Sequence, residues 1–235
     1  CTCLCKFLIL PIMSTMSPMP TILITGFAPF NQEAINPSWE VVKQFEGRQF
    51  GNTHQIQIAQ LACEFGHAIE QLHALLDQHQ PEIAICIGQA GGRADISIER
   101  IAINIDDARI PDNAGAQPID ETIVVGGPAA YFSSLPLKAL LKNLRDNSIP
   151  ANISQTAGTY VCNHVFYGLM HYANTHPNLK HAGFVHIPYL PSQACHHPGA
   201  ASMSIETLEK ALSLLVETTV KVNPSSDLPI KLSAG

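Results

Sequence analysis

Residues 56–88 read IQIAQLACEFGHAIEQLHALLDQHQPEIAICIG, and this stretch decides the fold class of the chain. It holds a short strand-like run at 56–61, an amphipathic segment at 65–78 and a strand-like run at 82–88 that is apolar from Ile83 onward. The amphipathic segment repeats apolar residues every three or four positions, which is typical of a helix that buries one face. The order strand, helix, strand is that of an α/β fold.

Similar patterns continue on both sides of this stretch. An apolar run at 21–25 (TILIT) predicts a strand, and Asn36-Pro37-Ser38 opens a helix that runs through Phe45. Toward the C-terminus, the patterns predict a strand over 96–105, a long loop over 106–120, helices at 135–147, 161–173 and 204–220, and strands near 153 and at 183–187. This alternation favours a largely parallel sheet, whose ligands bind beyond the carboxyl ends of the strands. The loops after Thr25 and Ile87 are therefore where we expect chemistry.

Composition limits the kind of protein this is. The 235 residues are 46% hydrophobic and 14% charged, which suits a single domain with a real core. A net charge of −6, without a run of Lys or Arg, argues against binding to nucleic acid or to an anionic membrane. No apolar run approaches the roughly 20 residues that a membrane-spanning helix needs. The seven cysteines form neither a CxxC pair nor a dense framework, so we expect reduced thiols in a cytoplasmic protein.

The patterns divide the chain into three segments. We expect a disordered leader over 1–19, one catalytic domain over 20–222 and a frayed tail over 223–235. The apolar run at 7–13 weakly resembles a signal peptide, but it is short, is interrupted by a proline and lacks a clear cleavage site.

Cys162 is the first candidate for chemistry, because it follows Gly158 closely and lies at the start of the predicted helix. A helix N-terminus stabilises negative charge, so it is expected to lower the pKa of this thiol and favour the nucleophilic thiolate. A buried structural cysteine is the alternative, and the local sequence leaves both open.

His186 is the candidate general base, since it ends a short apolar strand and the pKa of histidine lies near neutrality. A core histidine bonded to a backbone carbonyl is the alternative. Spacing alone does not separate it from the other histidines, among them His164, His171, His176, His181, His196 and His197.

Glu99 is the third candidate, because a carboxylate in an otherwise apolar stretch needs a partner. One possible partner is His186, which Glu99 would hold in the correct tautomer as in other catalytic triads. An ion pair with Arg100 or Arg109 is an equally good local interpretation.

Two further motifs carry weaker signals. GQAGGR at 88–93 lacks the G-x-G-x-x-G order and the Walker lysine, which argues against a nucleotide site. It is interpreted as a tight turn that offers the Gln89 amide to a ligand, or as a flexible turn. Cys195-His196-His197 are adjacent and cannot easily share one ion, and no second cluster has zinc spacing. We expect no metal and no cofactor.

A series of motifs in one order is the most specific signal of the chain. The motifs are GFAPF at 26–30, NPSWE at 36–40, GQAGGR at 88–93, ERIAIN at 99–104, DDARIPDNAGAQPID at 106–120, GTYVCN at 158–163 and GFVHIP at 183–188. Together they resemble the pyroglutamyl peptidase I (pyrrolidone-carboxylate peptidase) family of cysteine peptidases, from about residue 20 to about residue 217. The resemblance implies a single-domain, three-layer α/β/α sandwich with a largely parallel mixed sheet.

The resemblance also implies the site residues. The catalytic triad would be Cys162, His186 and Glu99. In the pocket for a lactam ring, Phe27 and Phe30 would clamp the ring, and Tyr160 and Val161 would flank the nucleophile. Asn36 and Gln89 would be the polar contacts, and Arg109 would lie beside the oxyanion.

The activity implied is hydrolysis of the amide bond after an N-terminal pyroglutamyl residue, through a thioester, on N-terminally pyroglutamylated peptides. The family also implies a homo-oligomer, a homotetramer. A thiol deamidase acting on another small amide and an inactive α/β binding module are the alternatives. The chain departs from the family after Phe30, where glycines are common and this sequence has NQEA at 31–34, and at Tyr160, where Phe is common.

Overall fold

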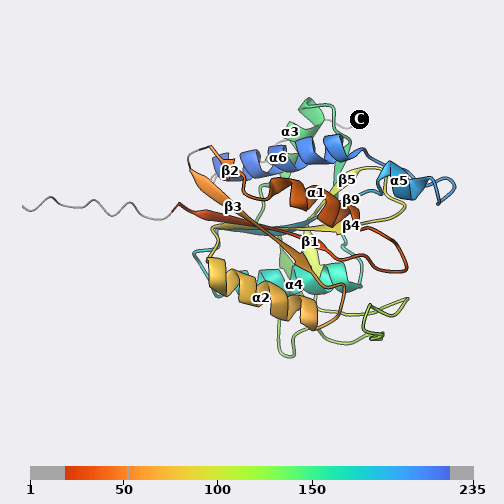
Figure 1. Cartoon of the computed structure of the whole chain (residues 1–235). Helices are drawn as coiled ribbons and strands as arrows, with labels where there is room; N and C mark the ends of the chain where they lie inside the picture. The colour runs from red at the N-terminus through yellow and green to blue at the C-terminus, as the bar shows by residue number, and fades with distance from the viewer. Residues whose placement is uncertain (1–18, 52, 223–235) are drawn as a thin grey trace, which may run out of the picture.

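A seven-stranded sheet forms the centre of the fold (Figure 1). The computed structural model describes residues 19–51 and 53–222, so the predicted tail and all but Met19 of the predicted leader lie outside the described residues. In spatial order the strands are β2 (Gln49–Phe50), β3 (His54–Leu61), β1 (Thr21–Phe27), β4 (Ile83–Gln89), β9 (His181–Ile187), β5 (Ile96–Glu99) and β8 (Ala151–Ser154).

Most neighbouring strands are parallel. β3, β1, β4 and β9 run in one direction, and β5 is parallel to β8. Only β2 against β3 and β5 against β9 are antiparallel within this sheet. The prediction of a largely parallel mixed sheet is therefore confirmed.

Helices cover both faces of the sheet (Figure 1). One face carries α1 (Pro37–Val42), α3 (Leu137–Asp146) and α6 (Ile205–Lys221), and the other carries α2 (His67–His79) and α4 (Val161–Ala173). Each side has its own apolar cluster, which includes Leu140 and Leu212 on the first face and Leu72 and Phe166 on the second. The predicted three-layer α/β/α sandwich is confirmed. Among the described residues, no helix combines the length and apolar character needed to cross a bilayer.

The predicted strand over 96–105 is wrong as a single element. β5 ends at Glu99, and β6 (Ile101–Ile103) belongs to a separate two-stranded sheet with β7 (Ala130–Phe132). The apolar positions change parity at this point, from even numbers up to Ile98 to odd numbers from Ile101. A continuous strand would turn Ile101 to the opposite face, because successive side chains alternate between faces.

The other departures are short elements. The sequence patterns did not predict β2, β7 or the one-turn helix α5 (Pro191–Ala194), which have two to four residues each. The helix expected through Phe45 ends as α1 at Val42 and continues as a 3-10 turn over Lys43–Phe45. Such short elements bury too few side chains to leave a periodic pattern.

The start of α1 is fixed by its own cap and by the end of β1. The Asn36 side chain caps the helix by accepting a hydrogen bond from Ser38 N at 3.1 Å, and Pro37 occupies the first turn. The Ser38 hydroxyl accepts a hydrogen bond from Phe27 N at 2.9 Å. These bonds set the course of the loop that joins β1 to α1.

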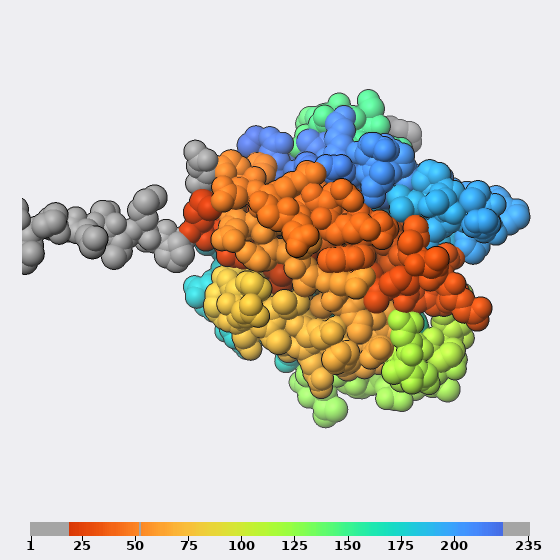
Figure 2. Space-filling model, in the orientation of Figure 1, coloured from red at the N-terminus to blue at the C-terminus, as the bar shows by residue number. Residues whose placement is uncertain are grey.

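This loop contains two non-glycine residues in the left-handed region. Asn31 has φ 52° and Gln32 has φ 62°. These are the positions where the sequence replaces the glycines expected from the family resemblance. The loop lies beside the segment near residue 113 (Figure 2), and Asn113 Nδ2 donates a hydrogen bond to Pro29 O at 2.9 Å. The chain thus keeps a glycine-like turn at the cost of backbone strain.

We expect Gln32→Gly to stabilise the protein by about 0.5–1 kcal/mol, because glycine relieves the left-handed strain and loses part of that gain to its greater freedom in the unfolded chain. Urea denaturation of wild type and variant measures the difference. Asn31→Gly is the matched control and should gain less, since Asn tolerates this region. An equal or lower stability of Gln32→Gly would show that the turn is not strained.

Candidate active site

The sheet register brings His186 and Glu99 together. β9 pairs His186 with Ser97 of the antiparallel β5, and residues directly opposite each other point to the same face. Glu99 lies two residues beyond Ser97, so it shares that face and lies diagonally across from His186. The His186 Nδ1 atom lies 2.8 Å from Glu99 Oε1, and both side chains are buried. The ring is thereby held with Nε2 facing away from the carboxylate.

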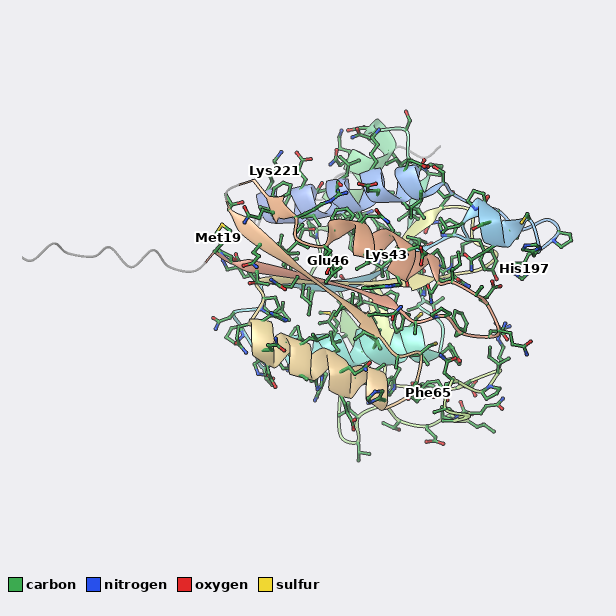
Figure 3. The ribbon with its side chains drawn as sticks, in the orientation of Figure 1. Met19, Lys43, Glu46, Phe65, His197 and Lys221 are labelled. Carbon is green, nitrogen blue, oxygen red and sulfur yellow. The ribbon has the colours of Figure 1, made fainter. Side chains whose placement is uncertain are left out.

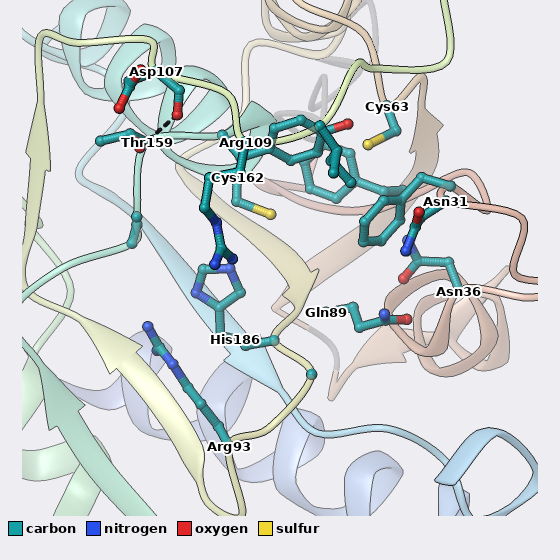
Figure 4. A pocket seen from close by; sticks show the side chains of 18 residues that line it. Asn31, Asn36, Cys63, Gln89, Arg93, Asp107, Arg109, Thr159, Cys162 and His186 are labelled. Atoms are coloured by element: carbon teal, nitrogen blue, oxygen red, sulfur yellow. Dashed lines mark hydrogen bonds between the residues drawn. The ribbon is translucent and has the colours of Figure 1, made fainter. Parts of the chain in front are cut away.

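Cys162 approaches the same point from α4, where it is the second residue of the helix. β4 pairs Gly88 with His186. A Cβ atom built on Gly88 would lie only 2.9 Å from Cys162 Sγ, so the sulfur occupies the space that a side chain at position 88 would fill. Cys162 and His186 both line one cavity of about 710 Å³ (Figure 4). Part of its wall comes from the loops after β1 and β4, the expected places, and part comes from residues 107–110 and 157–160.

Burial, rather than the helix end, dominates the pKa of the nucleophile. The sequence led us to expect a lowered pKa for Cys162. Burial instead raises the pKa of this thiol well above its usual value, and the negative charge of Glu99 acts in the same direction. The positive charge of Arg93 opposes the rise. Cys162 is therefore a neutral thiol in the free site.

His186 and Glu99 have complementary charge states. Burial lowers the pKa of His186 below its ordinary value, although the hydrogen bond and charge of Glu99 oppose this. Burial raises the pKa of Glu99, but hydrogen bonds from His186, Ser154 and Arg93 outweigh it and leave that pKa low. The site thus holds a neutral imidazole with its proton on Nδ1, donated to an ionised Glu99, and a free Nε2.

Arg93 is the residue that the sequence patterns missed. Its Nη1 donates to Glu99 Oε1 at 2.6 Å, so the ion pair expected with Arg100 or Arg109 is made by Arg93. Its Nη2 donates to Thr156 O at 3.0 Å, in the segment that leads to Cys162. Arg93 lies six residues before Glu99, and only the turn after β4 brings them together. The Gly pair in GQAGGR was the available signal for such a turn.

His164 forms a second buried acid–base pair close to the cysteine. Its Nδ1 lies 2.7 Å from Asp106 Oδ2, but its Nε2 accepts a hydrogen bond from Gly66 N at 2.8 Å. Both ring nitrogens are therefore occupied by protein groups. His164 is also not among the residues that line the cavity. The structure thus favours His186 over His164 as the candidate general base, a choice that the sequence spacing leaves open.

Aromatic side chains form one wall of the cavity. Phe27, Phe30 and Tyr160 all line it, and the ring centroids of Phe30 and Tyr160 are 6.1 Å apart. Tyr160 is held from behind by Phe65, in an edge-on contact at 5.4 Å, and its hydroxyl donates to Pro111 O at 3.1 Å. Val161, in contrast, is fully buried in the apolar cluster under α4 and does not line the cavity.

The polar residues expected in the pocket differ in what they can still bind. Asn36 lines the cavity, but its Oδ1 caps α1 and its Nδ2 donates to Ala28 O at 3.0 Å. Gln89 and Arg109 also line the cavity. Arg109 belongs to the predicted loop over 106–120, which is tied to the segment before α4 by a hydrogen bond from Thr159 Oγ1 to Asp107 O at 2.8 Å (Figure 4).

The Cys195-His196-His197 motif does not converge. Cys195 Sγ donates to Ser192 O, whereas His197 Nε2 lies 2.7 Å from Glu33 Oε1. In the described part of the chain, no group of three or more His, Cys, Asp or Glu side chains is arranged to hold a metal ion.

Comparisons with known sequences identify the family of this chain. The sequence model of the family described as pyroglutamyl peptidase matches residues 20–222. The pyrrolidone-carboxylate peptidase of Cupriavidus taiwanensis is 56% identical over 203 residues, which are 86% of this chain and 94% of that protein. The pyrrolidone-carboxylate peptidase of Yersinia pestis is 55% identical over 204 residues, which are 87% of this chain and 94% of that protein.

Solved structures give the same result. The crystal structure of pyroglutamyl peptidase I from Bacillus amyloliquefaciens has a TM-score of 0.83 and 45% sequence identity, and the match covers 87% of this chain and 96% of that one. A mutant pyrrolidone carboxyl peptidase from Pyrococcus furiosus has a TM-score of 0.83 and 43% identity, over 86% of this chain and 98% of that one. Sequence and structure together place this chain in the pyroglutamyl peptidase family of cysteine peptidases.

Proposed function

We propose that this enzyme hydrolyses the amide bond that follows an N-terminal pyroglutamyl residue, through a thioester between that residue and Cys162. The observation that carries the proposal is the position of the Cys162 sulfur over Gly88, next to the strand position of His186, in a cavity with an aromatic wall. The names of the matched relatives, pyrrolidone-carboxylate peptidase and pyroglutamyl peptidase I, support the same substrate.

The first chemical step uses a neutral thiol and a neutral imidazole. His186 Nε2 takes the proton of Cys162 as the sulfur attacks the pyroglutamyl carbonyl carbon. Glu99 accepts the Nδ1 hydrogen bond throughout and stabilises the imidazolium that forms. The buried thiolate therefore exists only while the S–C bond is forming, when its charge passes to the carbonyl oxygen.

The developing oxyanion lies near the start of α4. Backbone N–H groups of the first turn have no intrahelical acceptors, and the N-cap residue Tyr160 makes no side-chain cap bond to them. They are thus available to an oxyanion, and losing one such donor typically costs about 3 kcal/mol of transition-state stabilisation. Arg109 lines the same cavity and adds positive charge. His186 then gives its proton to the leaving amine and activates water to hydrolyse the thioester.

The substrate fits the chemistry of the cavity. Pyroglutamate is an uncharged lactam, so its ring needs an apolar slot and a few polar contacts rather than a counter-ion. Phe27, Phe30 and Tyr160 provide the slot, and Gln89 provides an amide. The homotetramer, the cytoplasmic location and the absence of nucleic-acid and membrane partners stay predictions.

We expect Cys162→Ala to lower kcat/KM for pyroglutamyl-7-amino-4-methylcoumarin by about 10⁴-fold or more, because the substitution removes the sulfur that forms the thioester in the proposed reaction. Release of the aminocoumarin is measured by fluorescence. Cys195→Ala is the matched control, since Cys195 is exposed and lies outside the cavity, and it should keep full activity. Full activity of Cys162→Ala would refute the nucleophile, and an inactive wild type would refute the substrate.

Gly88→Ala should lower kcat by about 100-fold without unfolding the protein. The added methyl would lie 2.9 Å from Cys162 Sγ and 2.7 Å from the Phe184 ring, so the sulfur must leave the position that it holds over residue 88. Assays with the same substrate measure the loss, and far-ultraviolet circular dichroism reports the fold. Unchanged kcat in a folded variant would mean that the sulfur does not react from this position.

Arg93→Met should move the acidic limb of the kcat/KM profile to higher pH. The positive charge of Arg93 lowers the pKa of His186, so removing it raises that pKa and keeps the imidazole protonated to higher pH. Only the neutral imidazole can take the thiol proton. Arg100→Met is the control and should leave the limb in place, because Arg93, not Arg100, bonds Glu99. Coincident profiles of Arg93→Met and wild type would contradict the charge balance described above.

A further inference from the structure

Gln193 is a buried polar residue on α5, outside the residues that line the cavity. The orientation of its amide follows from its surroundings. Its Oε1 accepts a hydrogen bond from Leu190 N at 3.3 Å. Its Nε2 faces three oxygen atoms, Gln89 Oε1 at 3.1 Å, Glu33 Oε2 at 3.3 Å and Ile35 O at 3.4 Å. Turning the amide over would place an oxygen against these three acceptors, so only one orientation is satisfied.

The orientation of Gln193 determines that of Gln89. Because Gln193 Nε2 donates to Gln89 Oε1, the oxygen of the Gln89 amide is turned toward Gln193 and one of its two lone pairs is engaged there. The Nε2 group of Gln89 is the end left for a ligand, and Gln89 lines the cavity. In Figure 4, the Gln89 amide points away from His186, toward the side of the cavity where Asn36 lies.

The same contacts hold the loop that follows Phe30. Glu33 and Ile35 belong to this loop, and both accept from Gln193. Glu33 is also bonded to His197, which lies on the segment after α5 (Figure 3) and stacks on Tyr189 with ring centroids 4.9 Å apart. Gln193 is therefore held from one side by the loop of Glu33 and Ile35, which His197 in turn supports, so it can hold Gln89 in place.

We propose that Gln193 is a positioning residue that fixes the polarity of the Gln89 amide, so that the cavity offers a hydrogen-bond donor to the ring carbonyl of the substrate. The inference rests on the proposed function and deepens it, because it says which polar atom of the lactam is recognised. A ring that keeps the carbonyl but lacks the N–H satisfies this donor. A ring that lacks the carbonyl leaves it buried and unpaired, which is costly.

Three aminocoumarin amides test, with the wild-type enzyme, whether the cavity recognises the ring carbonyl. They carry the pyroglutamyl, the 3-oxocyclopentanecarbonyl and the cyclopentanecarbonyl group, so the second keeps only the ring carbonyl and the third has neither polar group. We expect kcat/KM of the oxo compound to exceed that of the cyclopentane compound by roughly 10- to 100-fold, mainly through KM. Equal values for these two compounds would overturn the donor assignment without requiring any variant to fold.

Gln193→Glu tests the positioning role itself. A carboxylate at position 193 accepts a hydrogen bond from Leu190 N but cannot donate one to Gln89. The Gln89 amide is then expected to turn its Nε2 toward the carboxylate at position 193 and its oxygen toward the cavity. Gln193→Glu is combined with Glu33→Gln, because the second substitution removes the repulsion between the carboxylates at positions 33 and 193. The amide at position 33 also restores a hydrogen-bond donor next to the carboxylate at position 193. In the double variant we expect the advantage of the oxo compound over the cyclopentane compound to disappear. Glu33→Gln alone should keep most of it.

The controls make the outcomes distinct. Ser192→Ala, an exposed neighbour on α5, should keep the wild-type ratio between the substrates. A folded double variant that still prefers the oxo compound by the wild-type factor would refute the role of Gln193. A wild type that cleaves none of the three compounds would refute the proposed function, and this inference with it. A wild type that cleaves pyroglutamyl amide but shows no preference for the oxo compound refutes only the inference.

Discussion

The antiparallel pairing of β5 with β9 is the constraint on which the site depends. In a sheet whose other central strands are parallel, this reversal places Ser97 opposite His186 and thus sets Glu99 diagonally across from the imidazole. β4 flanks β9 on its other side and contributes Gly88, whose missing side chain leaves room for the sulfur of Cys162. Hydrogen bonds between strands, rather than flexible loops, therefore determine where the reacting groups meet.

The electrostatics of the site follow from its burial. A helix N-terminus favours a thiolate, but here desolvation has the larger effect and the free thiol stays neutral. Arg93 compensates in part, since it donates to Glu99, binds the segment before α4 and adds positive charge near the sulfur. In the proposed mechanism, the imidazolium and the oxyanion therefore form together and only during the reaction.

Much of the fold could be predicted from sequence, and the reasons for the failures are physical. Helices and strands that bury one or both faces show a regular spacing of apolar residues in the sequence. That spacing predicts the ends of these elements to within a few residues. The break at Arg100 shows in the sequence as a change of the apolar positions from even to odd numbers. The motifs identified Cys162, His186 and Glu99, and the structure brings the last two into contact. Arg93 belongs to the GQAGGR motif, whose glycines indicate a turn but not the partner that the turn brings to Arg93, and Gln193 carries no periodic pattern at all.

The central position of β9 has a consequence for how the molecule opens. Its neighbours β4 and β5 protect its backbone amides on both sides, so His186 belongs to a region that can exchange with deuterium only through extensive unfolding. The aromatic wall, in contrast, rests partly on the loops near Phe30 and Pro111, which are held by side-chain hydrogen bonds from Asn113 to Pro29 and from Tyr160 to Pro111. Local opening of surface loops costs less free energy than unfolding of a central strand, so we expect deuterium to exchange in these loops well before it exchanges in β9.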